Sequence, residues 1–250
     1  MDSTKFTVLS TQRSGSTWLI DILNKLNNTT VYGELFLPQE RMWDAGSIDY
    51  PRFVQAPVQR HVIRPISVFS YLNTLYSRPG AVGFKLMYSQ LRIYPEILVY
   101  LRVQNIKTIH LVRKNHLNVL ISKKLVQSRG QFHVLINQEN EEQENEDVQK
   151  VYLEPEKLIP EMTRMARRIN LVGSILRMLR IPHYEVIYEE LAANKGCFEP
   201  ILRFLKLDSE GVVPQSSLRK IANKRHIDLI SNYNEVKRAL ATSEFRDLIE

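Results

Sequence analysis

The chain alternates short apolar runs with longer segments whose apolar residues recur at helical spacing. Short runs bounded by turn residues are typical of buried strands, and apolar residues about 3.6 positions apart are typical of one helix face. Strands that alternate with helices predict an α/β fold with a central parallel sheet flanked by helices. The predicted strands are residues 6–10, 30–32, 81–88, 108–112 and 183–188. The predicted helices are residues 18–26, 67–76, 95–104, 115–127, 156–179, 198–204 and 233–248.

No internal repeat and no Gly/Ser-rich linker divides these segments, so we expect one domain over residues 1–250. Residues 37–65 contain four prolines and little periodicity, which indicates a loop-rich segment suited to line a pocket. Residues 137–147 form an acidic, low-complexity stretch, which indicates a solvated, mobile loop.

Composition narrows the class of protein. Apolar residues make up 44% of the chain, enough for a large core, and no apolar run reaches the ~18 residues that a membrane-spanning helix needs. The first residues lack the basic-then-apolar pattern of a signal peptide. The one cysteine, Cys197, has no partner for an internal disulfide, and no Cys/His cluster suggests zinc. We therefore expect a soluble, cytoplasmic protein without a bound metal.

The chain is basic, with a net charge of +7 from 34 Lys and Arg against 27 Asp and Glu. Six of these acids and no base lie within residues 137–147, so the rest of the chain carries a net charge of +13. Such a charge suits an anionic partner such as nucleic acid, a membrane surface or a phosphate-bearing ligand, although it also serves solubility alone. No nucleic-acid recognition motif and no interleaving of aromatic and basic residues is present, which disfavours nucleic acid.

The first predicted strand runs into a loop of small polar residues, 11–17, and then into a helix. A helix that begins in this way presents backbone N–H groups and a positive dipole end to an anion. Arg13 adds a fixed positive charge, and Gly15 lacks the Cβ that would block close approach. The loop is not a Walker A motif, which needs a second glycine and a lysine, and an ordinary helix-capping turn is the alternative. Ser14, Ser16 and Thr17 add hydroxyl donors.

A second basic group follows the predicted strand 108–112. Arg113 and Lys114 end this strand, and Ser122 lies on the helix after it. Ligands bind at the carboxyl ends of strands in parallel sheets, so these side chains could bracket one phosphate. The alternative is a basic helix start that faces water.

Together these residues resemble the signatures of sulfotransferases that use 3'-phosphoadenylyl sulfate (PAPS). Residues 11–19 resemble the family's T-x-R-S-G-S-T-x-L motif, and Arg113 with Ser122 resembles its second signature, a strand-ending arginine followed by a serine. Residues 83–90 resemble the bacterial branch that includes trehalose and nodulation-factor sulfotransferases. The resemblance implies a single α/β domain with a P-loop-like loop that binds phosphosulfate. Further similar stretches are residues 188–191, 200–205 and 230–236.

The resemblance implies PAPS and its product adenosine 3',5'-bisphosphate (PAP) as cofactors. The 3'-phosphate would contact Ser122 and either Arg113 or Lys114, because the family's usual spacing of eight fits Lys114 whereas its residue type fits Arg113. Late basic residues, Lys224 and Arg225, would close over the same phosphate, or else form a solvated face. The residues implied for the 5'-phosphosulfate are Arg13, Ser14, Gly15, Ser16, Thr17 and Trp18, with core packing as the alternative for Trp18.

Sulfuryl transfer to a hydroxyl needs a general base. Glu34, in a Gly-Glu pair after the second strand, resembles the proposed base of bacterial sugar sulfotransferases. His61 and His116 are alternatives, because imidazole titrates near neutrality. Arg13 would act electrostatically, and Lys85, on a buried-looking strand, would bind a sulfonate or cofactor oxygen.

The predicted activity is therefore transfer of a sulfuryl group from PAPS to a hydroxyl of a small molecule or glycan, by in-line displacement. The alternatives are a P-loop-like nucleotide-binding protein or kinase, and a non-catalytic family member. A kinase would need a loop lysine and a Mg²⁺-binding acid, and neither is evident. An apolar stripe on the last helix, from Val236 to Leu248, would pack internally or in a homodimer. Residues that could stack on an acceptor, or serve the core, are Tyr50, Phe53, Phe69 and Tyr71.

Overall fold

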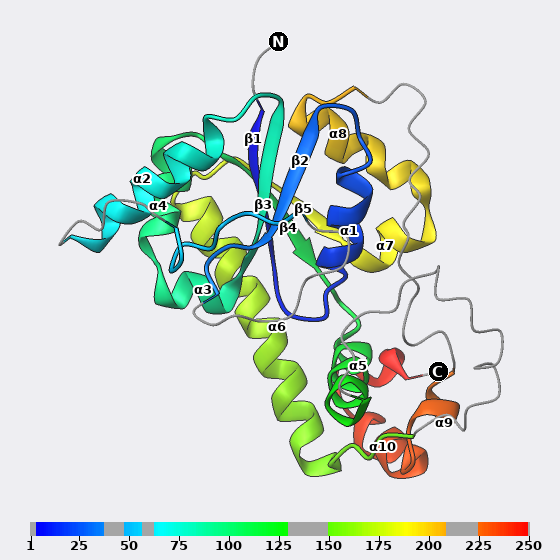
Figure 1. The fold of residues 1–250 in the computed structure, drawn as a ribbon. Helices are drawn as coiled ribbons and strands as arrows, with labels where there is room; N and C mark the ends of the chain where they lie inside the picture. The colour runs from blue at the N-terminus through cyan, green and yellow to red at the C-terminus, as the bar shows by residue number, and fades with distance from the viewer. Residues whose placement is uncertain (1–3, 38–47, 57–62, 130–149, 209–224, 250) are drawn as a thin grey trace. The chain divides into compact units, whose positions relative to one another are not determined.

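The computed structural model of the chain describes residues 4–37, 48–56, 63–129, 150–208 and 225–249. Two compact units are present, Met1–Val112 with Val172–Ser216 and Arg113–Leu171 with Ser217–Glu250. Strands and helices alternate along the chain (Figure 1), which confirms the predicted α/β class. A single domain over residues 1–250 stays a prediction. The acidic stretch 137–147 and part of segment 37–65 lie outside the described residues.

The first unit is built on five parallel strands in the order β2-β3-β1-β4-β5. The central strand is β1, so the chain leaves it toward one edge of the sheet and later reaches the other edge. At such a reversal the loops that follow neighbouring strands diverge and leave room for a ligand. The strands are β1 Lys5–Ser10, β2 Thr29–Glu34, β3 Ala81–Met87, β4 Lys107–Val112 and β5 His183–Ile187.

Helices fill the connections between strands, as parallel pairing requires. Most lie close to their predicted positions, but three short helices, α3, α7 and α9, were not predicted. The helices are α1 Ser16–Leu23, α2 Arg64–Tyr76, α3 Tyr88–Ile93, α4 Glu96–Val103, α5 His116–Arg129, α6 Pro155–Met178, α7 Tyr188–Ala193, α8 Glu199–Leu205, α9 His226–Leu229 and α10 Tyr233–Leu240, with short 3₁₀ turns η2 Lys195–Phe198 and η3 Arg246–Leu248.

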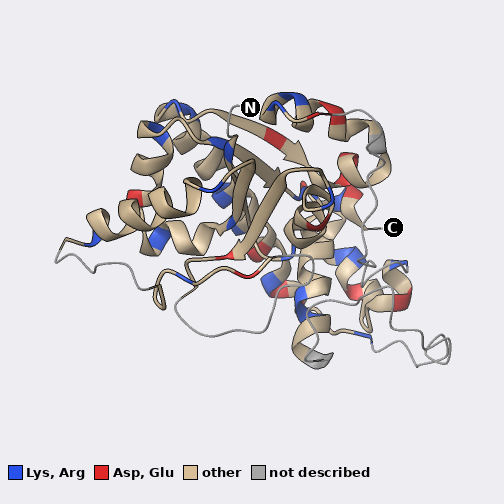
Figure 2. Ribbon diagram, turned by 45° about the horizontal axis from the view of Figure 1, so that its top comes forward, with Lys and Arg blue, Asp and Glu red and all other residues tan. Residues whose placement is uncertain are grey.

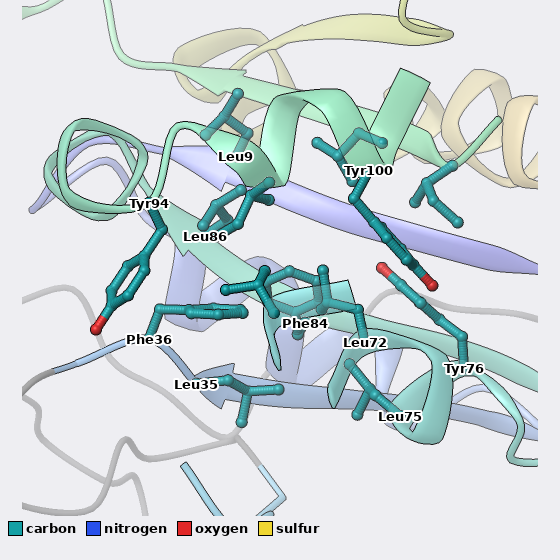
Figure 3. Close-up of a cluster of buried hydrophobic side chains, with 14 of the residues drawn as sticks. Leu9, Leu35, Phe36, Leu72, Leu75, Tyr76, Phe84, Leu86, Tyr94 and Tyr100 are labelled. Atoms are coloured by element: carbon teal, nitrogen blue, oxygen red, sulfur yellow. The ribbon is translucent and has the colours of Figure 1, made fainter. Parts of the chain in front are cut away.

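Each face of the sheet has its own core. On β1, Phe6 points into a cluster with α1, α7 and α8, whereas Leu9 points into a cluster with α2, α3, α4 and the end of α6. Figure 3 shows this second cluster, in which Phe84 of β3 packs near Tyr76 and Tyr100. Burial on both faces explains why the strands form nearly continuous apolar runs in the sequence.

The second unit has a separate core made by α5, the amino-terminal part of α6, α9 and α10. Val151 forms a parallel bridge with Ile230, and this bridge ties the segment before α6 to the segment before α10. Val236 and Leu240 are fully buried in this core, so the predicted apolar stripe packs inside the unit.

Several predicted element ends are wrong: the strand predicted over 183–188 ends at Ile187, and the helix predicted over 18–26 ends at Leu23. Side-chain hydrogen bonds explain two further cases. The strand predicted over 81–88 ends at Met87, because Gln90 Oε1 accepts the Met87 N–H at 3.1 Å and α3 starts at Tyr88. The helix predicted over 233–248 ends at Leu240. There Ser243 Oγ donates to the Leu240 carbonyl at 2.9 Å and accepts the Phe245 N–H at 3.2 Å. A serine that satisfies backbone groups in this way competes with helix continuation.

The turn before β3 requires a glycine at position 80. Gly80 has φ +83°, and a Cβ added there would lie 2.4 Å from the Asn28 carbonyl oxygen. We therefore expect Gly80→Ala to lower the free energy of unfolding by about 2 kcal/mol or more, because both conformation and contact oppose a side chain. Urea unfolding followed by circular dichroism measures the change.

The matched control is Asn28→Gly. Asn28 itself has φ 55°, which glycine adopts readily, so this change should leave stability nearly unaltered. Wild-type stability in Gly80→Ala would contradict the account of this turn.

Candidate functional site

The loop between β1 and α1 makes a tight turn at the carboxyl end of the central strand. Arg13 and Gly15 have positive φ angles, 62° and 83°. Gly15 is the N-cap of α1 and has no side chain to cap the helix, and the first turn contains no acidic residue. The amino-terminal end of α1 therefore combines a positive dipole with backbone N–H groups that no N-cap side chain covers, which favours an anion.

The loop serines are buried and support the turn. Ser14 Oγ donates to the Thr11 carbonyl at 2.7 Å and is fully buried, so this hydroxyl closes the loop. Ser16 and Thr17 are also buried, in the first turn of α1. The hydroxyl of Ser14 thus holds the backbone in place, and a ligand would meet that residue through its N–H group.

An aromatic cluster packs against the loop. A Cβ added at Gly15 would lie 2.2 Å from Cε2 of Tyr188, so the Tyr188 ring occupies the space that a side chain would need. Trp18 lies edge-to-face with Tyr188 and with Phe198, with ring centroids 5.8 Å apart in both pairs. Trp18 packs against the core under α1 but remains partly exposed. The loop conformation is therefore fixed from the side of α7.

Lys85 is a buried cation beside this loop. Its Nζ donates to Thr17 Oγ1 at 3.1 Å and lies 3.2 Å from Glu34 Oε1. The Lys85 side chain is 5% exposed and that of Glu34 is 15% exposed. A buried ammonium group needs such partners, because its desolvation is costly. Three residues predicted separately, Thr17, Glu34 and Lys85, are thus connected in the structure.

Glu34 ends β2 at an irregularity in the sheet. The register with β3 shifts between Tyr32 and Glu34, and this shift places Glu34 opposite Lys85. Gln90 Nε2 donates to the second carboxylate oxygen, Oε2, at 3.1 Å. Both oxygens of Glu34 therefore face donors, which fixes the orientation of the carboxylate. The role of Gln90 was not predicted from the sequence, where its place at the end of stretch 83–90 is the only signal.

The predicted 3'-phosphate ligands belong to the second unit. Arg113 and Lys114 follow β4, and Ser122 lies on α5. Ser122 is buried, whereas Lys114 is exposed. Arg225 is exposed and pairs with Asp228 at 3.2 Å. Binding of one phosphate by these groups stays a prediction.

The structure describes one of the two alternative bases. His116 belongs to the second unit, where its buried ring lies edge-to-face with Phe245 at 6.0 Å. His61 and Lys224 lie outside the described residues. The carboxylate of Glu34, in the first unit, is joined to the loop through Lys85.

The aromatic residues considered for acceptor stacking pack against the core that contains α2 and α4. Arg78 adds a cation–π contact, with its guanidinium carbon 4.9 Å from the centre of the Tyr50 ring. Core packing thus accounts for their burial. They are Tyr50, Phe53, Phe69 and Tyr71.

A buried polar chain that was not predicted from the sequence joins α3, β4 and β5. His110 of β4 is fully buried; its Nε2 contacts the Tyr88 hydroxyl, and its Nδ1 lies 3.3 Å from Glu185 Oε2. Burial lowers the pKa of His110 to about 4, although Glu185 acts in the opposite direction. A neutral imidazole accepts from the Tyr88 hydroxyl through Nε2, whereas Nδ1 is buried without a hydrogen-bond partner among the described residues. The signal in the sequence was a histidine within an apolar strand.

Charged residues lie mainly on helices and loops, and the strands are mainly uncharged (Figure 2). Among the described residues, no helix combines the length and apolar character that crossing a membrane requires. Within the same ranges, no three His, Cys, Asp or Glu residues are grouped as a metal site would need.

No protein-family model and no curated protein matches the chain.

His110 should make the stability of the protein depend on pH. Its pKa falls from 6.5 to about 4 on folding, so between these values the unfolded chain binds more protons and stability rises with pH. We expect this residue to remove up to about 3 kcal/mol of stability as the pH falls through that window. Urea unfolding at about pH 7, 6 and 5 measures the slope.

The variant His110→Gln should flatten the slope between those pH values. The comparison is His183→Gln, which alters a partly exposed histidine on the neighbouring strand β5; its charge contributes to the lowered pKa of His110, so this variant should change the slope only slightly. An unchanged slope in His110→Gln would show that His110 is not the group responsible.

Proposed function

We propose that the protein is a sulfotransferase that moves a sulfuryl group from PAPS to a hydroxyl of a carbohydrate or other small acceptor. The observation that carries the proposal is the link from loop 11–17 to Glu34 through the buried Lys85. A turn suited to an anion, a fixed cation and a carboxylate meet at one end of a parallel sheet, where such sheets bind ligands. The resemblance of residues 11–19 to the sulfotransferase motif supports the same assignment.

The loop suits the phosphosulfate end of the cofactor. The first N–H groups of α1 would bind its oxygens, and Arg13 would add a charged fork that matches an oxyanion. The partly exposed ring of Trp18 offers an apolar surface beside the loop. In the second unit, Ser122 with Arg113 or Lys114 keeps its predicted role as the 3'-phosphate ligand. Lys224 and Arg225 keep their predicted role of closing over the same 3'-phosphate.

Glu34 would act as the general base. PAPS, when bound, supplies an activated sulfuryl group on a phosphate leaving group. The acceptor oxygen forms a bond to sulfur as the bond from sulfur to the phosphate oxygen breaks, and the hydroxyl proton passes to Glu34. Lys85 and Gln90 orient the carboxylate, and each oxygen retains a further lone pair for the acceptor.

Lys85 and Arg13 would provide fixed positive charge. Lys85 contacts both Thr17 and Glu34, so its charge stabilises negative charge on the loop side and on the carboxylate side of the site. Arg13 stays protonated at any relevant pH, so its contribution is electrostatic.

Calorimetric titration with PAP in EDTA tests the cofactor site, with ATP as the comparison ligand. We expect metal-free binding of PAP, and a loss of affinity of about 10- to 100-fold in Arg13→Ala, because charge-assisted hydrogen bonds to a phosphate are lost. Arg203→Ala is the matched control, since Arg203 is exposed and pairs with Glu199 on α8. Failure to bind PAP, or preference for ATP with Mg²⁺, would favour a nucleotide-binding protein instead.

Transfer of radioactive sulfate from PAPS to a panel of saccharides tests the base. Glu34→Gln should retain PAP affinity and lose turnover by about 10²- to 10⁴-fold, because an amide does not take the acceptor proton. Glu190→Gln, at an exposed position on α7, is the control. Circular dichroism establishes that both variants are folded, and wild-type turnover by Glu34→Gln would exclude Glu34 as the base.

A further inference from the structure

A shallow groove of ≈ 450 Å³ follows one face of α6 between Ile159 and Leu171. Arg164, Arg167 and Arg168 line it. With Leu171 these arginines occupy positions i, i+3, i+4 and i+7 of the helix, which bring them to one face. The groove therefore presents three guanidinium groups next to apolar side chains at both of its ends.

The three arginines have no internal partner among the described residues. None of their guanidinium groups forms an ion pair with a carboxylate there, although other exposed arginines do, such as Arg203 with Glu199. All three are exposed, and Leu171 is 60% exposed. Three like charges on two adjacent turns repel one another, so an anionic ligand would relieve this repulsion as well as form new contacts.

We propose that this groove binds an acidic segment of a partner protein. A guanidinium group pairs with a carboxylate through two parallel hydrogen bonds, and the spacing of three arginines along one helix face suits a row of acidic side chains. Ile159 and Leu171 would contact apolar residues that flank the acids. The proposal is independent of sulfuryl transfer, because it uses none of the residues assigned to that reaction.

A membrane surface is the less favoured partner. Helices that lie in a lipid interface usually anchor there with Trp, Phe or several leucines, and residues 159–171 contain no aromatic residue and one leucine. The surface is also hollowed, which suits a polypeptide segment better than a planar bilayer.

Fluorescence anisotropy with a labelled acidic peptide tests the proposal. The probe is a synthetic peptide with the sequence of residues 137–147, which has six acids and no base. The full chain should bind it, with an affinity that falls as salt screens the charges. Replacing Arg164, Arg167 and Arg168 together by Gln should weaken binding at least tenfold.

The matched control replaces three exposed arginines elsewhere, Arg203, Arg238 and Arg246, by Gln, which changes the net charge by the same amount. It should alter the affinity less than threefold. Equal weakening by both triple variants would overturn the proposal, because the probe would then respond to overall charge alone.

Two further arms identify the occupant. One uses a chain in which the six acids of residues 137–147 are replaced by their amides. If the amide-substituted chain binds the probe and the wild-type chain does not, the groove is covered by the protein's own acidic stretch, and the partner assignment is wrong. The other arm uses phosphatidylserine vesicles. If the wild-type chain sediments with these vesicles and the variant with Arg164, Arg167 and Arg168 replaced by Gln does not, while the control triple variant still does, the groove binds a membrane and the partner assignment is wrong. Absence of probe binding in every chain would also overturn the proposal.

Discussion

The buried charge of Lys85 is the interaction on which the arrangement of the candidate site depends. An ammonium group taken out of water costs several kcal/mol unless partners compensate for the lost hydration. Here the partners come from two other elements, Thr17 at the start of α1 and Glu34 at the end of β2. The requirement to satisfy one cation therefore holds α1, β2 and β3 in a single arrangement at the carboxyl end of the sheet.

The surrounding architecture keeps this arrangement rigid. Neighbouring residues of β3, Phe84 and Leu86, point into the core on the opposite face, so the strand that carries Lys85 is packed on both sides. Gln90 links the first turn of α3 to Glu34, while Tyr88 of the same turn contacts the buried His110. The short helix α3 is thus fixed by polar contacts as well as by its apolar residues. Such support of a carboxylate by groups that are themselves held in place is what a positioned base requires.

The sequence predicts those features that depend on local pattern. The strands were predictable because a sheet covered on both faces leaves uninterrupted apolar runs, and the loop 11–17 was identifiable from its small residues between a strand and a helix. The start of α3 and the end of α10 were not predictable, because side-chain hydrogen bonds of Gln90 and Ser243 decide them. The partners of Lys85 were equally hidden. Glu34 reaches it through a register shift in the pairing of β2 with β3, and a lone sequence gives no sign of that shift.

A double-mutant cycle on Lys85 and Glu34 tests the central claim most directly. The free energy of unfolding would be measured in urea for wild type, Lys85→Met, Glu34→Gln and the double variant. Each single change should cost about 2 kcal/mol or more, because it leaves a buried group without its partner. The double variant should lose less than the sum of the two, by at least about 1 kcal/mol. Additive losses would contradict the account, because the two side chains would then act independently.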